Sequence, residues 1–126
     1  MKIKQLSVFV ENKTGRINEV TQILGSNGVN MTAFSLADSG EFGILRMIVS
    51  DVERAVSALK EARFGISVTE VVCFCCPNEP GALSIVLDCL ARENVFIEYM
   101  YAFSDGDTAR VVIRPTDLDR CIEILT

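Results

Sequence analysis

The sequence contains no histidine and no tryptophan among its 126 residues. Without histidine it lacks the most common general base, the usual activator of serine and cysteine nucleophiles, and the most common zinc ligand. No pair of carboxylates with a catalytic partner stands out in its place. We therefore expect neither an enzyme nor a bound cofactor.

Long apolar runs and basic clusters are also missing. No stretch approaches the roughly 18 apolar residues of a membrane helix, and Gln5 and Ser7 interrupt the N-terminal residues in a way that a signal peptide does not. Asp and Glu (17) outnumber Lys and Arg (12), which gives a net charge of −5. The composition predicts a soluble, cytoplasmic protein that binds neither nucleic acid nor membrane.

The residues that are present allow a real hydrophobic core. Apolar residues make up 49 % of the chain and charged residues 23 %, and the length suits one ordinary domain or two very small ones. The five cysteines are an odd number in a chain without a secretory signal. This predicts reduced thiols and no disulfide framework.

The chain repeats itself at an offset of 66 positions. The period exceeds that of solenoid repeats and indicates duplication of a small domain. We expect a first domain of residues 1–68 and a second of residues 69–126. Identical residues at this offset include Asn12 and Asn78, Gly15 and Gly81, Val20 and Val86, Leu24 and Leu90, and Asp51 and Asp117.

Each copy has the pattern of strand, helix, strand, strand, helix, strand. Such a pattern predicts an α+β, ferredoxin-like βαββαβ domain whose antiparallel sheet carries its helices on one face. In the first copy the strands are expected at residues 3–10, 31–37, 44–49 and 66–69. The first helix lies between Gly15 and Gly28, and the second is capped by Ser50 or Asp51.

Turn residues mark a hairpin in each copy, around Asp38-Ser39-Gly40 and around Asp105-Gly106. By comparison with the first copy, the second stops at Thr126, partway through its final helix. It lacks its last strand in this sequence, which predicts an exposed strand edge. Either a natural tail has been lost, or something else covers that edge.

Three cysteines crowd the stretch VCFCCPNEPG at residues 72–81. Strand alternation places Cys73 and Cys75 on one side and Cys76 on the other, so the three cannot surround one tetrahedral ion. The alignment also pairs most cysteines with apolar residues, and cysteine behaves as a small hydrophobe. We therefore expect buried, structural cysteines, with a metal or redox site as the weaker alternative. The aligned pairs are Cys73 with Ser7, Cys75 with Phe9, Cys76 with Val10, Cys89 with Ile23, and Cys121 with Ala55.

Two equivalent loops, ENKTGRI at residues 11–17 and PNEPGAL at residues 77–83, precede the first helix of each copy. Glycine allows the close approach of a ligand, and Pro80 suits the first helical turn. The unpaired N–H groups of a helix start favour a carboxylate, and a neighbouring Asn offers both a donor and an acceptor. These groups together suit a free amino acid.

The motif Asn-Glu-Pro-Gly-Ala-Leu, followed by NVFIEYMYAF at residues 94–103, resembles the signature of the ACT domain. Nearly the whole chain is similar to stand-alone tandem ACT proteins. The resemblance implies a regulatory module that binds an amino acid or a related metabolite at an interface between paired domains. It also implies a homo-oligomer formed by ACT–ACT pairing. A ligand-free dimerisation or assembly module is the alternative.

The resemblance also implies which residues contact the ligand. The first copy has Thr14 in place of the proline and an additional charge at Arg16, and the second has Phe96 where the first has Asn30. We therefore expect two unequal sites, the first better suited to a polar ligand, although Asn12 and Asn78 could instead cap their helices. The implied residues are Asn12, Thr14, Gly15, Arg16, Ile17 and Asn30 in the first copy, and Asn78, Pro80, Gly81, Ala82 and Leu83 in the second.

Overall fold

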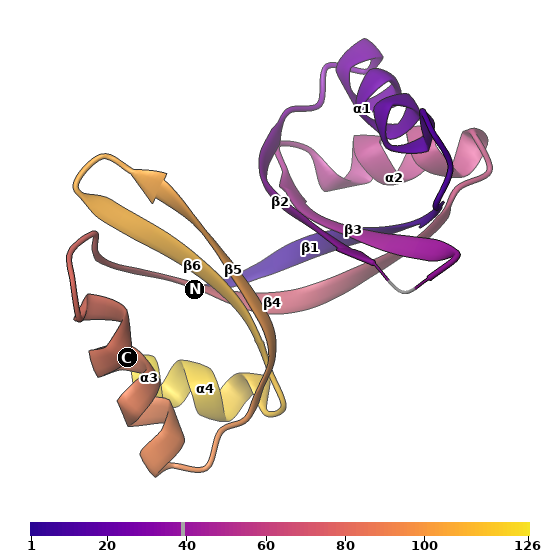
Figure 1. Cartoon of the computed structure of the whole chain (residues 1–126). Coiled ribbons are helices and arrows are strands. Elements are labelled where there is room, and N and C mark those ends of the chain that lie inside the picture. The colour runs from indigo at the N-terminus through magenta and orange to yellow at the C-terminus, as the bar shows by residue number, and fades with distance from the viewer. Residues whose placement is uncertain (39) are drawn as a thin grey trace. The chain divides into compact units, whose positions relative to one another are not determined.

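The computed structural model describes residues 1–38 and 40–126 and has an α+β fold (Figure 1). The described residues form six strands and four helices. They divide into two compact units, an N-terminal unit of Lys4–Thr69 and a C-terminal unit of Met1–Ile3 together with Glu70–Thr126. The first three residues of the expected domain 1–68 thus group with the other unit.

The N-terminal unit contains the order of elements that the periodicity predicts. Its strands lie in the order β2-β3-β1-β4, and β3 pairs antiparallel with both β1 and β2. Ser39, within the expected hairpin turn, lies outside the described residues. The elements are β1 (Lys2–Glu11), α1 (Arg16–Ser26), β2 (Met31–Asp38), β3 (Phe42–Val49), α2 (Val52–Glu61) and the first part of β4 (Gly65–Pro77).

The core of the N-terminal unit follows from the alternation of side-chain direction along β1. Leu6, Val8 and Val10 point to one face and are at most 2 % exposed. Both helices of the unit cover this face of the sheet (Figure 1). Burying such aliphatic side chains stabilises a fold by about 1.5–3 kcal/mol each. The same cluster includes Val20 and Leu24 of α1, Leu45 and Met47 of β3, and Ala55 and Leu59 of α2.

The C-terminal unit repeats this packing. Its strands lie in the order β4-β6-β5, and α3 and α4 lie on the same side of them (Figure 1). The elements after β4 are α3 (Ala82–Arg92), β5 (Ile97–Asp105), β6 (Thr108–Pro115) and α4 (Leu118–Leu125). Its buried cluster contains Val72, Phe74, Cys76, Leu90, Val95, Val111, Ile113 and Cys121.

The strand expected at residues 66–69 continues without a break into the second copy as one strand, β4 (Gly65–Pro77), which both units share. In the C-terminal unit the backbone N–H of Cys73 donates to the carbonyl of Met1 at 2.7 Å. The first residue of the chain therefore lies beside Cys73 of β4. Satisfying that N–H removes one of the unpaired groups that make a strand edge prone to association.

Helix ends differ in how their backbone groups are satisfied. The Asp51 carboxylate accepts from the Arg54 N–H at 3.1 Å, and Asp117 accepts from Arg120 at 3.0 Å. Asp51 is thus the cap of α2, and the Ser50 hydroxyl instead accepts from the backbone N–H of Asn30. The same hydrogen bond thus caps the second helix of each copy. This shows that these residues, 66 positions apart, occupy equivalent places in the structure.

Replacing Asp51 by alanine should lower the free energy of unfolding by about 1 kcal/mol, because the N–H of Arg54 loses its acceptor. The variant Asp51→Asn is the matched control, since its amide oxygen can still accept. Urea unfolding followed by circular dichroism measures both variants. Equal losses in the two would show that the charge of Asp51, and not the hydrogen bond, stabilises α2.

Candidate functional site

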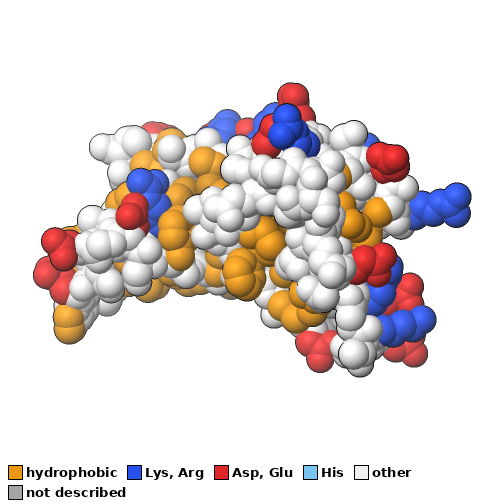
Figure 2. All heavy atoms as spheres, turned by 90° about the horizontal axis from the view of Figure 1, so that it is seen from above, with side chains coloured by type: hydrophobic (Ala, Val, Ile, Leu, Met, Phe, Trp, Pro, Cys, Tyr) orange, Lys and Arg blue, Asp and Glu red, His pale blue; other side chains and the backbone are white. Residues whose placement is uncertain are grey.

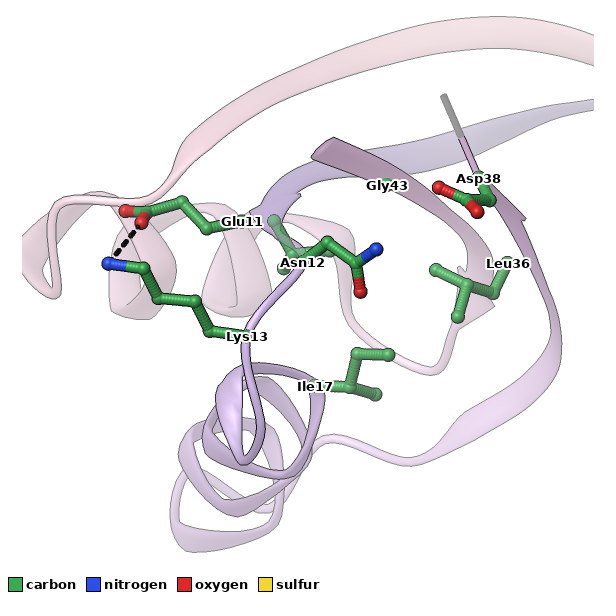
Figure 3. A pocket seen from close by; sticks show the side chains of 8 residues that line it. Glu11, Asn12, Lys13, Ile17, Leu36, Asp38 and Gly43 are labelled. Atoms are coloured by element: carbon green, nitrogen blue, oxygen red, sulfur yellow. Dashed lines mark ion pairs between the residues drawn. The ribbon is translucent and has the colours of Figure 1, made fainter. Parts of the chain in front are cut away.

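A cavity of about 160 Å³ lies at the loop between β1 and α1 (Figure 3). The loop contributes polar groups, and the ends of β2 and β3 complete the walls. Of the residues that the sequence implied for the first site, the cavity includes Asn12 and Ile17. Its lining consists of Val10, Glu11, Asn12, Lys13, Ile17, Leu36, Asp38 and Gly43.

Asn12 is fixed by two hydrogen bonds to the hairpin that joins β2 to β3. Its backbone N–H donates to the carbonyl of Glu41 at 2.8 Å, and its side-chain Nδ2 donates to the carbonyl of Gly40 at 3.1 Å. Because the amide nitrogen is bonded to the hairpin, the orientation of Asn12 is set by the fold. In Figure 3 the amide oxygen of Asn12 is turned toward Ile17.

Two charged groups next to Asn12 pair with each other. The Lys13 ammonium lies 2.9 Å from the Glu11 carboxylate, and this hydrogen bond lowers the pKa of Glu11. The pair lies on the side of Asn12 away from Leu36 and Asp38 (Figure 3). The polar groups directed at the space between the loop and β2 are therefore Asn12 and Asp38.

The helix that follows the loop starts without a side-chain cap. Gly15 has φ 88 and Gly81 has φ 86, a left-handed conformation, and neither α1 nor α3 has a side-chain hydrogen bond at its N-terminus. Glycine adopts this conformation without strain. The other two helices carry Asp caps at the same position. The N–H groups of Arg16 and Ala82 donate to the carbonyls of Lys13 and Glu79, each at 3.2 Å. The other first-turn N–H groups of α1 and α3 can donate to an external anion.

Arg16 does not line the cavity. Its Nη1 lies 2.7 Å from the Glu19 carboxylate, and its guanidinium carbon lies 4.5 Å from the centroid of the Phe64 ring. The helix places Arg16 and Glu19 on adjacent turns, which favours their pairing. Arg16 is therefore engaged within the N-terminal unit at the start of α1 and lies outside the lining of this cavity.

Thr14, Gly15 and Asn30 are also absent from the described lining. Asn30 precedes the first residue of β2, whereas Asp38 ends that strand, so roughly 25 Å of extended backbone separate them. The N-terminal unit does not bring Asn30 and Asn12 together. Sequence reasoning missed Leu36, Asp38 and Gly43, although strand pairing of the two halves of the hairpin could have placed them beside the loop.

A second cavity, of about 340 Å³, lies at the equivalent loop of the C-terminal unit. Three implied residues, Pro80, Gly81 and Ala82, line it. Asn78 does not, and Leu83 packs against the core. The lining is Cys75, Cys76, Pro77, Glu79, Pro80, Gly81, Ala82, Ile85 and Val86, so Glu79 is its one charged residue among those described. The linings of the two cavities therefore differ in chemistry.

The expectation of buried cysteines is correct for Cys76 and Cys121 and wrong for Cys75 and Cys89, which are exposed. The alignment itself holds, because Cys75 occupies the position of Phe9, which is 47 % exposed on the face of its sheet away from the helices. An apolar partner in the alignment therefore does not guarantee burial. Cys73 is intermediate, and its loss of hydration raises its pKa.

Within residues 1–38 and 40–126, no group of three or more Cys, Asp or Glu side chains is placed to hold a metal ion. Over the same residues, no helix is long and apolar enough to cross a membrane.

Iodoacetamide should modify Cys75 and Cys89 in the native protein, and Cys76 and Cys121 only after unfolding, because alkylation requires an accessible thiolate. Since the pKa of Cys73 is raised, a smaller fraction of it is thiolate at any pH below that pKa. Its alkylation rate should therefore keep rising with pH toward that raised pKa. Mass spectrometry of digested samples measures each site, and equal rates at all five would contradict the burial pattern.

A family model described as "ACT domain pair" matches residues 1–126. Among solved structures, the chain is similar to protein BT0572 from Bacteroides thetaiotaomicron, with 52 % identity and a TM-score of 0.95 over 99 % of this chain and 87 % of that chain. A comparison with the curated proteins found no match.

The chain is also similar to the regulatory subunit of aspartate kinase from Thermus thermophilus in its ligand-free form, with 13 % identity, a TM-score of 0.70, and coverage of 97 % of this chain and 89 % of that chain. The corresponding subunit from Thermus flavus has 12 % identity and a TM-score of 0.69 over 98 % and 90 % of the two chains. At these identities the likeness establishes a shared fold.

Proposed function

Because the chain belongs to the ACT domain pair family, we propose that it is a regulatory module that binds a free amino acid in the cavity beside Asn12. The two Thermus structures with this fold are regulatory subunits of aspartate kinase. The regulatory role proposed for this chain is extended from these two structures.

The observation that carries the proposal is the coincidence of a cavity with an uncapped helix start. The loop that lines the cavity leads directly into α1, whose first turn has no side-chain acceptor. An α-carboxylate placed there would receive hydrogen bonds from backbone N–H groups and the favourable end of the helix dipole. Asn12, oriented by its bond to Gly40, adds a polar contact beside that position.

The size of the cavity also favours a small ligand. Its volume of about 160 Å³ is several times the roughly 30 Å³ that one water occupies in the liquid. It is below the roughly 300–1,000 Å³ typical of sites for drug-sized ligands and cofactors. A single amino acid suits this space better than a nucleotide does.

A ligand-free assembly module is the second candidate. Apolar side chains reach the molecular surface (Figure 2). The exposed large apolar residues include Phe34 and Leu36 on β2 and Phe42 at the start of β3. Phe34 is 61 % exposed, and β2 is at one end of the strand order, where its outer backbone groups could pair with a second copy. This arrangement favours homo-oligomers with or without a ligand.

A thermal-shift screen of the full chain against the twenty amino acids separates the two candidates. A ligand at 100 times its dissociation constant stabilises the folded state by about 2.7 kcal/mol, which raises the melting temperature by several degrees in a protein of this size. We expect a selective shift with a small subset of the amino acids. No shift with any of them would leave the assembly module as the better description.

Asn12→Ala should weaken binding of a hit from this screen by roughly 2- to 12-fold, the equivalent of one neutral hydrogen bond. Asn78→Ala is the matched control, because Asn78 is the equivalent residue of the other copy and does not line its cavity. Calorimetry measures both affinities. A lower melting temperature with unchanged affinity in Asn12→Ala would show that Asn12 only ties the loop to the hairpin.

A further inference from the structure

The cavity beside Asn12 has an apolar side. Ile17 from the first turn of α1 and Leu36 from β2 extend toward the same space (Figure 3), and Val10 of β1 completes this wall. Ile17 is 39 % exposed and Leu36 is 51 % exposed. A ligand with an apolar side chain would cover both, and removing such surface from water favours binding.

Asp38 adds a negatively charged group to the lining of the same cavity. Its Oδ1 accepts from the backbone N–H of Gly40 at 3.0 Å, and no Lys or Arg of residues 1–38 and 40–126 forms an ion pair with it. Lys13, which also lines the cavity, is paired with Glu11 on the other side of Asn12 (Figure 3). Asp38 therefore presents a negative charge to the cavity without a protein cation to balance it.

The C-terminal unit has different residues at the positions of Asp38, Leu36 and Lys13. At the repeat offset, Asp38 corresponds to Ser104, Leu36 to Ala102 and Lys13 to Glu79. The second strand of the C-terminal unit ends one residue later, in Asp105, and Arg110 pairs with that carboxylate at 3.1 Å. The carboxylate that lines the C-terminal cavity belongs to the loop residue Glu79, so the two cavities carry their acidic group on different elements.

We propose that this cavity selects an α-amino acid with an uncharged, apolar side chain. This inference rests on the proposed function and specifies its ligand class. The α-ammonium group lies against Asp38, the side chain lies against Ile17 and Leu36, and the α-carboxylate lies at the uncapped start of α1. Asp38 is then the residue that distinguishes a zwitterionic amino acid from a simple carboxylic acid.

Charged amino acids fit this arrangement less well. A second carboxylate on the ligand would meet the negative charge of Asp38, and a cationic side chain would lie against the apolar wall without an acceptor. The Glu11 carboxylate is already engaged by Lys13. Burying a charge without a partner is unfavourable, which disfavours both classes.

The first experiment is calorimetry of the full chain with leucine and with two analogues that each lack one charged group, 3-methylbutylamine and 4-methylpentanoate. Lysine, aspartate and threonine complete the panel. We expect leucine to bind at least about tenfold more tightly than either analogue, because each loses one charge-assisted interaction. The charged amino acids and threonine should bind more weakly than leucine.

The second experiment tests Asp38 directly. Asp38→Asn removes the charge, and its amide oxygen can still accept from Gly40, so the turn is retained. Leucine affinity should fall by roughly 10- to 100-fold, while the affinity for 4-methylpentanoate should stay constant or rise. Asp88→Asn, which removes an exposed acid paired with Arg92 on α3, is the matched control and should leave both affinities unchanged.

The outcomes separate this inference from the proposed function. Tightest binding of lysine, aspartate or threonine would overturn the ligand class and leave an amino-acid sensor in place. Leucine binding that is unaffected by Asp38→Asn would overturn the role of Asp38. Absence of binding by every amino acid would overturn both the inference and the proposed function.

Discussion

Burial of Leu6, Val8 and Val10 on one face of β1 is the constraint on which the rest of the N-terminal unit depends. A shift of one residue in the pairing of β1 with β3 would move all three to the opposite face, so the core fixes the register. That register ends with Glu11 opposite Phe42. The chain therefore leaves the sheet at the end where the β2–β3 hairpin turns, and the residues of the loop meet those of the hairpin there.

The two copies share a backbone and differ in the side chains that it presents. The N–H groups of Asn12 and Asn78 donate to the carbonyls of Glu41 and Asp107 at 2.8 and 2.9 Å, so each loop is tied to its hairpin in the same way. Duplication thus preserves the frame of the site, because backbone hydrogen bonds depend little on side-chain identity. The lining was free to diverge, and one copy now combines amide, carboxylate and apolar groups while the other presents thiols and proline.

Arg16 and Asn30, near the two ends of α1, have surroundings that their positions in the sequence did not reveal. Arg16 follows the loop glycine, which suggested a ligand contact. Its guanidinium is paired with Glu19 on the same helix and lies over the ring of Phe64, which follows α2 in the chain. Asn30 is polar and close to a helix end, yet a strand of eight residues separates it from Asp38 at the cavity. A motif records which residues are present, whereas the direction of each side chain depends on partners that are distant in the sequence.

The sequence by itself determined the order of elements, the duplication and the position of both loops, because strand alternation, helical periodicity and turn residues are local properties. It also determined that Asp51 or Ser50 begins α2. Only the tertiary structure decided that Leu36 and Asp38 face Asn12, that Cys75 is exposed although its aligned partner is apolar, and that Met1 lies against β4. The physical reason is that these contacts join residues far apart in the chain, and the pairing of strands, which sets them, is decided by burial of the whole core.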